Sequence, residues 1–289
     1  MRKTIITPSV EQIINDALAI EAESAQDAGA LGFMARAMVQ ATLPHKKVVG
    51  NEFERRNGNY TLTLLAPSKI GLPYGTVPRL LLAWLTTEAV KTQSRELELG
   101  DSLAGFMREL GMSPTGGARG DITRLKDQTK RLFACSISAV YEDGQKSAFL
   151  NQSIASKAVL WWDAKDPEQI GLWQSTVTLS ESFFNEVVSH PIPVDMRALK
   201  ALKKSPLALD TYCWLTYRAS YAKRPSVIPW SVLALQFGSD YKVLRQFKAA
   251  FLAELRKVVT VYGGVQVEAT DEGLLVNPSL THISKKGNP

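Results

Sequence analysis

The spacing of apolar residues along the chain predicts the same set of helices twice. The first set comprises the stretches 83–92 (AWLTTEAVKT), 102–111 and 121–133, where apolar positions recur with helical period. The second set comprises 213–222 (CWLTYRASYA), 229–238 and 241–257. Each third helix leads directly into alternating β-branched residues, which predict a β-hairpin. The order helix, helix, turn, helix, hairpin is therefore predicted in both halves, which indicates one module built twice.

A glycine follows the second helix of each set, at Gly111 and at Gly238. Glycine readily adopts the left-handed conformation that ends many helices, so both positions predict a helix C-cap. The turn that follows is nine residues long in the first half, MSPTGGARG at 112–120, and only SD in the second half.

This order of elements is that of the winged helix-turn-helix. In that motif the third helix enters the major groove of DNA, and the hairpin contacts the flanking backbone. The pattern therefore predicts an α+β protein of two tandem winged-helix domains. The length of 289 residues agrees, because it favours two domains over one.

Further segments predict an amino-terminal arm and extra β-strands. Residues 9–41 have a helical period with an apolar face and a break near Gly29 and Gly32. Asn57 followed by Gly58, between alternating apolar residues, predicts a β-hairpin with a two-residue type I′ turn. The stretch 158–180 is also β-rich. Its tryptophans favour a buried strand face over the stacking of unpaired bases: Trp161, Trp162 and Trp173.

These segments give the expected domain boundaries. We expect a helical arm at 1–47, a first winged-helix domain with extra strands at 48–178, and a second winged-helix domain at 179–289. Pro191 and Pro193 mark the expected passage between the two modules. The large sheet of the first domain is expected to expose an edge at which two copies of the chain can pair.

The positive charge is concentrated in the two predicted third helices. The chain has 34 Lys and Arg against 28 Asp and Glu, a net charge of +6. Segment 241–257 alone has five Lys or Arg against one Glu, and segment 119–133 has five against two Asp. The rest of the chain is therefore slightly acidic, and the basic charge falls where a DNA-reading helix needs it.

A helical wheel of 241–257 separates an apolar side from a basic side. The apolar side comprises Leu244, Phe247, Phe251, Leu255 and Val258. The residues expected to contact DNA are Lys242, Arg245, Gln246, Lys248, Ala249, Arg256 and Lys257. Arginine can pair with guanine, lysine can neutralise phosphate, and the small Ala249 lets the backbone approach base edges. A merely solvated amphipathic helix is the alternative interpretation of this face.

The first of the two segments is expected to be the weaker reader. Its candidate DNA contacts are Arg119, Arg124, Gln128 and Arg131. Asp127 on the same face would repel phosphate, so the principal reader is expected in the second domain.

No pattern of catalytic or metal-binding residues is present in the sequence. The stretch SPTGGARGD at 113–121 has Arg119, Gly120 and Asp121 where a nucleotide P-loop needs Lys and Ser or Thr. The three histidines are far apart, and the two cysteines lie singly in apolar segments: His45, His190, His282, Cys135 and Cys213. We therefore expect no enzyme activity, no metal and no cofactor. A nucleic-acid enzyme such as a primase would need clustered carboxylates.

Neither a membrane segment nor a signal peptide is expected. No apolar run approaches the roughly 18 residues of a membrane helix, and the start MRKTIITPSVEQ lacks an apolar core. The expected location is the bacterial cytoplasm.

Long stretches resemble the plasmid-encoded RepA family of replication initiators. They are GLPYGTVPRLLLAWLTTEAVKTQSRELELGDSLAGFMRELG at 71–111, GGARGDITRLKDQTKRLF at 116–133 and PVDMRALKALKKSPLALDTYCWLTYRASY at 193–221. The resemblance spans roughly residues 68–280.

The resemblance implies an origin-binding protein that recognises directly repeated DNA sites, or iterons, through its carboxy-terminal winged helix. It further implies an inactive homodimer joined through the first domain, active monomers on DNA, and the host initiator and replicative helicase as partners. A transcriptional repressor that binds operator repeats with the same domains is the alternative, because repression needs the same DNA contacts.

Overall fold

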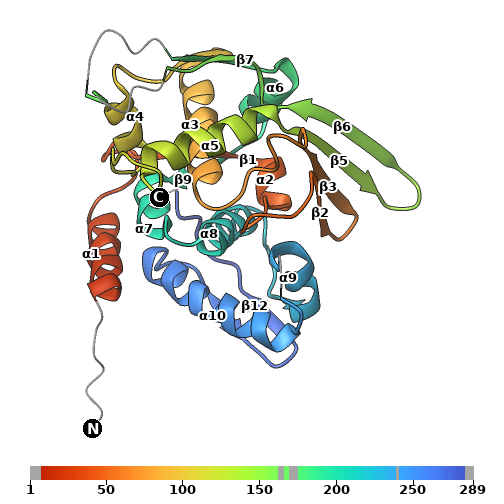
Figure 1. Ribbon diagram of the computed structural model, residues 1–289. Helices are drawn as coiled ribbons and strands as arrows, with labels where there is room; N and C mark the ends of the chain where they lie inside the picture. The colour runs from red at the N-terminus through yellow and green to blue at the C-terminus, as the bar shows by residue number, and fades with distance from the viewer. Residues whose placement is uncertain (1–7, 162–165, 169–174, 239–240, 284–289) are drawn as a thin grey trace. The chain divides into compact units, whose positions relative to one another are not determined.

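A computed structural model describes residues 8–161, 166–168, 175–238 and 241–283 (Figure 1). The chain divides into two compact units. The central unit comprises residues 33–191, and the split unit comprises residues 1–32 together with 192–289. The divisions fall within two short strands, β1 (Leu31–Ala35) and β9 (Pro191–Asp195).

The unit boundaries differ from the expected ones at 47/48 and 178/179. Residues 1–32 of the expected arm group with the carboxy-terminal part of the chain, whereas residues 33–47 and 179–191 group with the central unit. The second division falls next to Pro191, where the passage between the modules was expected.

The central unit is built around one almost fully buried helix. Its helices are α2 (Arg36–Gln40), α3 (Val77–Thr92), α4 (Leu103–Glu109), α5 (Asp121–Ala134) and α6 (Glu181–Ser189). Helix α3 is buried on nearly all sides because residues 80–85, LLLAWL, are apolar without interruption. Pro78 lies in the first turn, where its missing N–H is harmless. Helices α5 and α6 pack on it.

Two antiparallel sheets complete the central unit. One has the strand order β2 (Glu52–Asn57), β3 (Tyr60–Leu65), β5 (Ser136–Glu142) and β6 (Ser147–Ser153). The other has the order β4 (Glu96–Glu98), β8 (Thr176–Leu179) and β7 (Ala155–Val159). The extra strands expected in the first domain are therefore present. Trp162 and Trp173 lie outside the described residues, and Trp161 is 59% exposed instead of buried on a strand.

The predicted β2–β3 hairpin is confirmed, but its turn is shifted by one residue. Asn57 pairs with Tyr60, so the two turn residues are Gly58 and Asn59. Gly58 has φ +58°, whereas Asn59 does not have a positive φ. A positive φ at the first turn residue alone is typical of a type II′ turn, not type I′, and glycine is favoured there.

The split unit contains five helices and one three-stranded sheet among its described residues. The helices are α1 (Pro8–Ala22), α7 (Met196–Leu202), α8 (Pro206–Ala219), α9 (Trp230–Phe237) and α10 (Leu244–Val261). The sheet has the order β10 (Ser226–Pro229), β12 (Gly273–Val276) and β11 (Val267–Ala269). The break expected near Gly29 and Gly32 in the predicted helix 9–41 is present as a turn at 24–30, in which Gly29 has φ +63°. The first helix ends earlier than expected, at Ala22, and strand β1 precedes the return to helix at Arg36.

Both units contain the same order of elements. The order is helix, strand, helix, helix and two strands: α3, β4, α4, α5, β7 and β8 in one unit, and α8, β10, α9, α10, β11 and β12 in the other. In both three-stranded sheets the last strand of this order lies in the middle. The first helix also packs a tryptophan edge-on against a phenylalanine of the second. The ring centroids are 5.0 Å apart for Trp84 and Phe106, and 5.4 Å apart for Trp214 and Phe237.

The hairpin predicted to complete the first module is not the counterpart of β11–β12. Strands β5 and β6, which follow α5 directly, join the four-stranded sheet. The counterpart is the β7–β8 pair, which begins about twenty residues later in the chain. The central unit therefore has an inserted hairpin that local sequence alternation cannot distinguish from the expected one.

Glycine is needed for different structural reasons at the two helix ends, Gly111 and Gly238. Gly111 has φ +70°, as predicted for a left-handed C-cap. Gly238 has φ −76°, so the same prediction is wrong there. A β-carbon at Gly238 would lie 2.6 Å from the carbonyl oxygen of Ala234, so glycine is required by close packing of the backbone.

Candidate nucleic-acid interface

Helix α10 buries an aromatic face and exposes a basic one. Phe247 and Phe251 are fully buried, and Phe251 contacts the rings of Trp230 and Phe237 at centroid distances of 6.1 and 5.7 Å. Five of the predicted DNA contacts are exposed: Lys242, Arg245, Gln246, Ala249 and Arg256. We refer to these five residues as the α10 basic face. Their exposure was predicted from the wheel, and their contact with DNA stays a prediction.

The α10 basic face has cations available for a partner. Within the described part of the chain, Lys242, Arg245 and Arg256 form no salt bridge with an acidic side chain. The acid of the helix itself, Glu254, is instead paired with Lys257 at 2.8 Å. The guanidinium groups can therefore meet phosphates or guanines without first breaking an internal ion pair.

Lys248 and Lys257 are held in internal contacts, which the wheel did not foresee. The Lys248 ammonium donates to the carbonyl oxygen of Thr270 at 3.2 Å and lies 4.8 Å from the centre of the Trp230 ring. The hydrogen bond ties α10 to the β11–β12 hairpin, and the contact with Trp230 of α9 is a cation–π interaction. Lys257 is neutralised by Glu254. Both lysines are therefore expected to contribute less to DNA binding than the three free cations.

The start of α10 exposes large apolar side chains that the sequence analysis missed. Tyr241 is 40% exposed, Val243 is 50% exposed and Leu244 is 47% exposed. Leu244 was predicted on the buried side, but it precedes the first turn that packs on the core. Apolar side chains at the start of a groove-binding helix can contact the methyl group of thymine. No signal in the sequence separates these residues from core positions.

The β11–β12 hairpin carries negative charge. Its exposed charged residues are Glu268, Asp271 and Glu272, and residues 265–277 include no Lys or Arg. Carboxylates repel phosphate, so this hairpin is unsuited to the backbone contact expected of a wing. Within residues 241–277, the exposed cations that suit contact with phosphate are therefore those of α10 and Lys242 just before it.

In the central unit, two of the four predicted DNA contacts are not accessible. Gln128 is only 5% exposed, accepts from the backbone N–H of Tyr74 at 2.8 Å, and donates to Asp127 at 3.0 Å. The Arg131 side chain is 15% exposed, pairs with Asp127 at 2.8 Å, and lies 5.6 Å from the centre of the Tyr74 ring. Both side chains hold the 72–75 loop against α5, which excludes them from an exposed DNA-binding face.

The other two predicted contacts, Arg119 just before α5 and Arg124 on it, are exposed together with two lysines of α5. Arg119 is exposed, and Arg124 is 56% exposed while paired with Asp121 at 2.7 Å. Lys126 and Lys130, one turn apart, are exposed as well. These two lysines belong to the predicted basic segment 119–133, but no DNA contact was predicted for them. Their spacing of four residues was the available signal.

Candidate metal ligands are scattered among the described residues. Among them, no group of three or more His, Cys, Asp and Glu side chains is placed to hold a metal ion. Burial raises the pKa of the Cys135 thiol to about 12, so this thiol is protonated at neutral pH and a poor nucleophile. None of the described helices is long and apolar enough to span a membrane.

Comparison with known proteins identifies the class of this protein. Residues 72–231, more than half of the chain, match the family described as "Plasmid encoded RepA protein". The chain therefore belongs to this family of replication initiators. No curated protein sequence matches it significantly.

The fold is similar to that of domains 2 and 3 of RctB. A crystal structure of selenomethionine derivatives of these domains has a TM-score of 0.55 and 13% identity, covering 84% of this chain and 98% of that chain. A second crystal structure of the same domains has a TM-score of 0.51 and 14% identity, covering 83% and 94%. At this identity the likeness concerns the fold alone.

Proposed function

We propose that this initiator binds double-stranded origin DNA through two winged-helix units, with α10 as the principal reader. The single observation that carries the proposal is the α10 basic face, whose Lys242, Arg245 and Arg256 are exposed and pair with no acidic side chain in the described part of the chain. The order helix, strand, helix, helix and two strands, present in both units, supports the winged-helix assignment. Membership in the RepA family supports the origin as the DNA target.

In the proposed complex the start of α10 lies in the major groove. Arg245 and Gln246 contact base edges, Lys242 and Arg256 neutralise phosphates, and Ala249 permits close approach of the helix. Released counterions supply much of the affinity, so binding weakens as salt rises. The acidic β11–β12 hairpin stays clear of the backbone. In the central unit, Arg119, Arg124, Lys126 and Lys130 add contacts with phosphate.

The DNA sites are proposed to be direct repeats, and the free protein is proposed to be a homodimer. Strand β6 supports the dimer, because it is an outer strand of its sheet, and its sequence SAFLNQS contains no charge and no proline that would prevent pairing with another strand. Phe149 on this strand is 69% exposed. Pairing of two β6 strands would bury this ring and hold the inactive form.

Several bound monomers are then proposed to bend the origin, strain an A·T-rich segment and admit the host initiator and the replicative helicase. The protein changes no covalent bond in this scheme and acts in the cytoplasm on plasmid DNA. Support in trans of a plasmid that carries only the origin would distinguish this function from transcriptional repression.

The direct test compares exposed and internally held cations of the same helix. We expect Arg245→Ala combined with Arg256→Ala to weaken binding to origin repeats by about tenfold or more and to flatten its salt dependence. Lys248→Ala is the matched control, because this lysine is engaged with Thr270 and Trp230. Its salt dependence should stay near that of the wild type.

Binding is measured by fluorescence anisotropy with duplex origin DNA at several salt concentrations. An unchanged affinity and an unchanged salt slope in the double variant would refute α10 as the reader. Equal losses in the control and the double variant would refute the assignment of DNA contact to the exposed cations in particular, because the internally held Lys248 would then matter as much.

A further inference from the structure

Helix α1 has two apolar faces, and among the described residues of the split unit its packing contacts involve one of them. Ile13, Ala17 and Ile20 lie on the inner face, and Ile20 is 8% exposed. This face packs against α7 and α10. Such packing explains why the amino-terminal helix groups with the carboxy-terminal part of the chain.

The other apolar face of α1 is open to solvent. Val10 is 47% exposed, Ile14 is 39% exposed and Leu18 is 59% exposed. Their spacing of four residues places them in one line along the helix, which we refer to as the α1 stripe. Large apolar side chains at successive turns of an exposed helix are typical of a helix that docks into a groove of a partner. Scattered exposed residues would need no such explanation.

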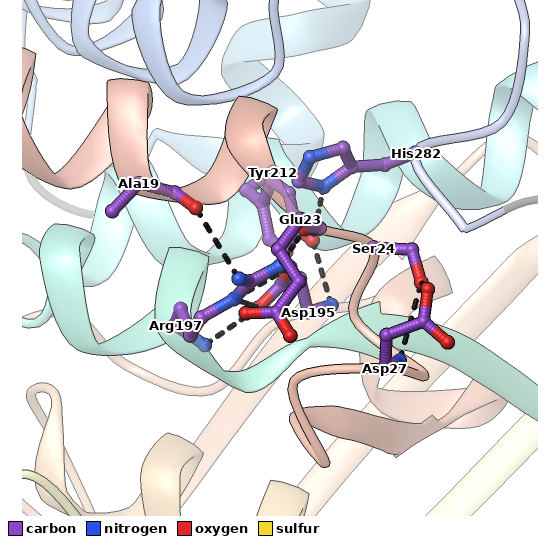
Figure 2. Close-up of polar contacts among 8 residues, drawn as sticks. All are labelled: Ala19, Glu23, Ser24, Asp27, Asp195, Arg197, Tyr212 and His282. Carbon is purple, nitrogen blue, oxygen red and sulfur yellow. Dashed lines mark hydrogen bonds and ion pairs between the residues drawn. The ribbon is translucent and has the colours of Figure 1, made fainter.

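Helix α1 is held in a fixed position by a polar cluster at its carboxy-terminal end (Figure 2). The Arg197 guanidinium donates to the carbonyl oxygen of Glu23 at 2.8 Å and to that of Ala19 at 3.4 Å. Asp195, whose side chain is 2% exposed, holds this guanidinium at 2.7 Å. The stripe is therefore presented on a pre-ordered helix, so a partner need not order it on binding.

The charge around the stripe is negative. Residues 8–27 include Glu11, Asp16, Glu21, Glu23 and Asp27 and no Lys or Arg. On the helical wheel Glu21 falls within the angle covered by the stripe and Glu11 lies beside it. A second copy of α1 would bring two acidic helices together, which is unfavourable. The complementary occupant is an apolar groove with Lys and Arg on its rim.

The stripe lies on a different part of the split unit from the start of α10. Lys257, Thr260 and Val261 of α10 line cavities together with residues of α1, whereas the residues proposed to read bases begin at Lys242. Helix α1 therefore neighbours the end of α10 that is further from the proposed base contacts. A protein on the stripe therefore need not cover the base-contacting start of α10, although Arg256, proposed to contact phosphate, precedes Lys257 at the end of α10 that neighbours α1.

We propose that the α1 stripe is the docking surface for a protein of the replication machinery that has an apolar groove rimmed by basic residues. The inference rests on the proposed function, because it places recruitment on α1 and DNA reading on α10. The interaction is of the helix-in-groove type, with Ile14 and Leu18 as anchors and Glu11 and Glu21 as pairing groups.

The test separates recruitment from DNA binding in the full-length protein. Ile14→Ser with Leu18→Ser is the stripe variant, and Leu280→Ser is the matched control, because Leu280 is 84% exposed in the same unit. Binding to purified host initiator and to purified replicative helicase is measured by biolayer interferometry. We expect the stripe variant to bind one of these proteins about tenfold more weakly, to lose support of origin-plasmid replication in cells, and to keep its affinity for origin DNA. The control should match the wild type in all three.

Charge variants test the chemistry of the occupant without removing apolar contacts. We expect Glu11→Lys with Glu21→Lys to weaken partner binding, and Glu98→Lys on β4 to leave it unchanged. Unchanged partner binding in the Glu11→Lys and Glu21→Lys variant would overturn the prediction that the partner's groove is rimmed by basic residues.

Other outcomes overturn the proposal as a whole. Wild-type protein that binds neither host protein, or a stripe variant that recruits and replicates normally, would do so. A change of oligomeric state in the stripe variant by analytical ultracentrifugation would assign the stripe to a second copy instead. Loss of DNA binding in the wild type would contradict the proposed function but leave the partner measurement valid.

Discussion

Helices α5 and α10 occupy the same place in the two units and have similar charge, but they offer different surfaces. Each segment has five cations in the sequence. In α5, Asp121 and Asp127 engage Arg124 and Arg131, and Gln128 is buried. In α10 the pair between Glu254 and Lys257 leaves Lys242, Arg245 and Arg256 without such partners among the described residues. The number of cations in a helix is therefore a poor measure of the charge it can offer to DNA.

The strands that follow these two helices also differ between the units. In the central unit α5 is followed by β5 and β6, which pair with β2 and β3 in a four-stranded sheet. In the split unit α10 is followed by the short β11–β12 pair. The extra sheet gives the central unit an outer strand that can pair with another copy. The contrast supports a division of labour between association and reading.

The largest expected effect concerns the independence of the two cores. Phe251→Ala in α10 and Phe106→Ala in α4 each remove a fully packed ring, at a cost of about 3–5 kcal/mol in the free energy of unfolding. We expect hydrogen exchange to increase in the unit that carries the change, and much less in the other. Equal loss of protection in both units would show that they unfold as one.

The next effect concerns the surface of α5. Lys126→Ala with Lys130→Ala should lower the salt slope of DNA binding by about two, because each lysine neutralises one phosphate. Gln128→Ala should leave the slope unchanged, but it should lower stability by about 1–3 kcal/mol, because the buried N–H of Tyr74 loses its acceptor. Salt titrations and chemical denaturation check the two outcomes. A changed slope for Gln128→Ala would mean that this side chain reaches DNA after all.

A smaller effect concerns the two helix-ending glycines. Gly111→Ala forces a left-handed conformation on alanine and should cost about 1 kcal/mol. Gly238→Ala should cost more, because its β-carbon meets the Ala234 carbonyl oxygen of a fixed helix backbone. Denaturation midpoints of the two variants provide the comparison, and a reversed order would contradict the packing reason given for Gly238.

The smallest effect is a pH dependence of opposite sign in the two units. Burial lowers the pKa of His282 in the split unit, so its contribution to stability is complete above the unfolded value of 6.5 and declines as pH falls through that value. Burial raises the pKa of Glu186 in the central unit, so its contribution is complete below 4.5 and declines as pH rises through that value.

Thermal unfolding between pH 7.5 and 5.5 tests the histidine. We expect the wild type to lose stability over this range relative to His282→Asn, whose side chain does not titrate. Glu186→Gln should gain stability relative to the wild type as pH rises from 4.5. Parallel pH profiles for the wild type and both variants would show that neither group is coupled to folding.

The sequence by itself determined the local elements and their order. The apolar period of 241–257 predicted the buried side of α10 correctly at Phe247, Phe251, Leu255 and Val258, because helical spacing alone fixes which side chains share a face. The resemblance to RepA initiators, present in long stretches of sequence, predicted the family. The order of the three helices in each module, and the hairpin directly after each third helix, were also readable because these signals are local, whereas strands β4 and β10 between the first two helices were not predicted.

Only the tertiary structure decided which of these elements come together and which charges stay available. Helix α1 packs on α7 and α10 from the other end of the chain, and the pair β7–β8, not β5–β6, matches the second hairpin. Three predicted DNA contacts are engaged inside the protein instead. Gln128 accepts from the Tyr74 N–H, Arg131 pairs with Asp127, and Lys248 donates to the carbonyl oxygen of Thr270. Contacts between residues distant in sequence leave no periodic signal in the sequence. The same holds for neighbours such as Asp127 and Arg131, whose side-chain rotamers depend on the surrounding tertiary contacts.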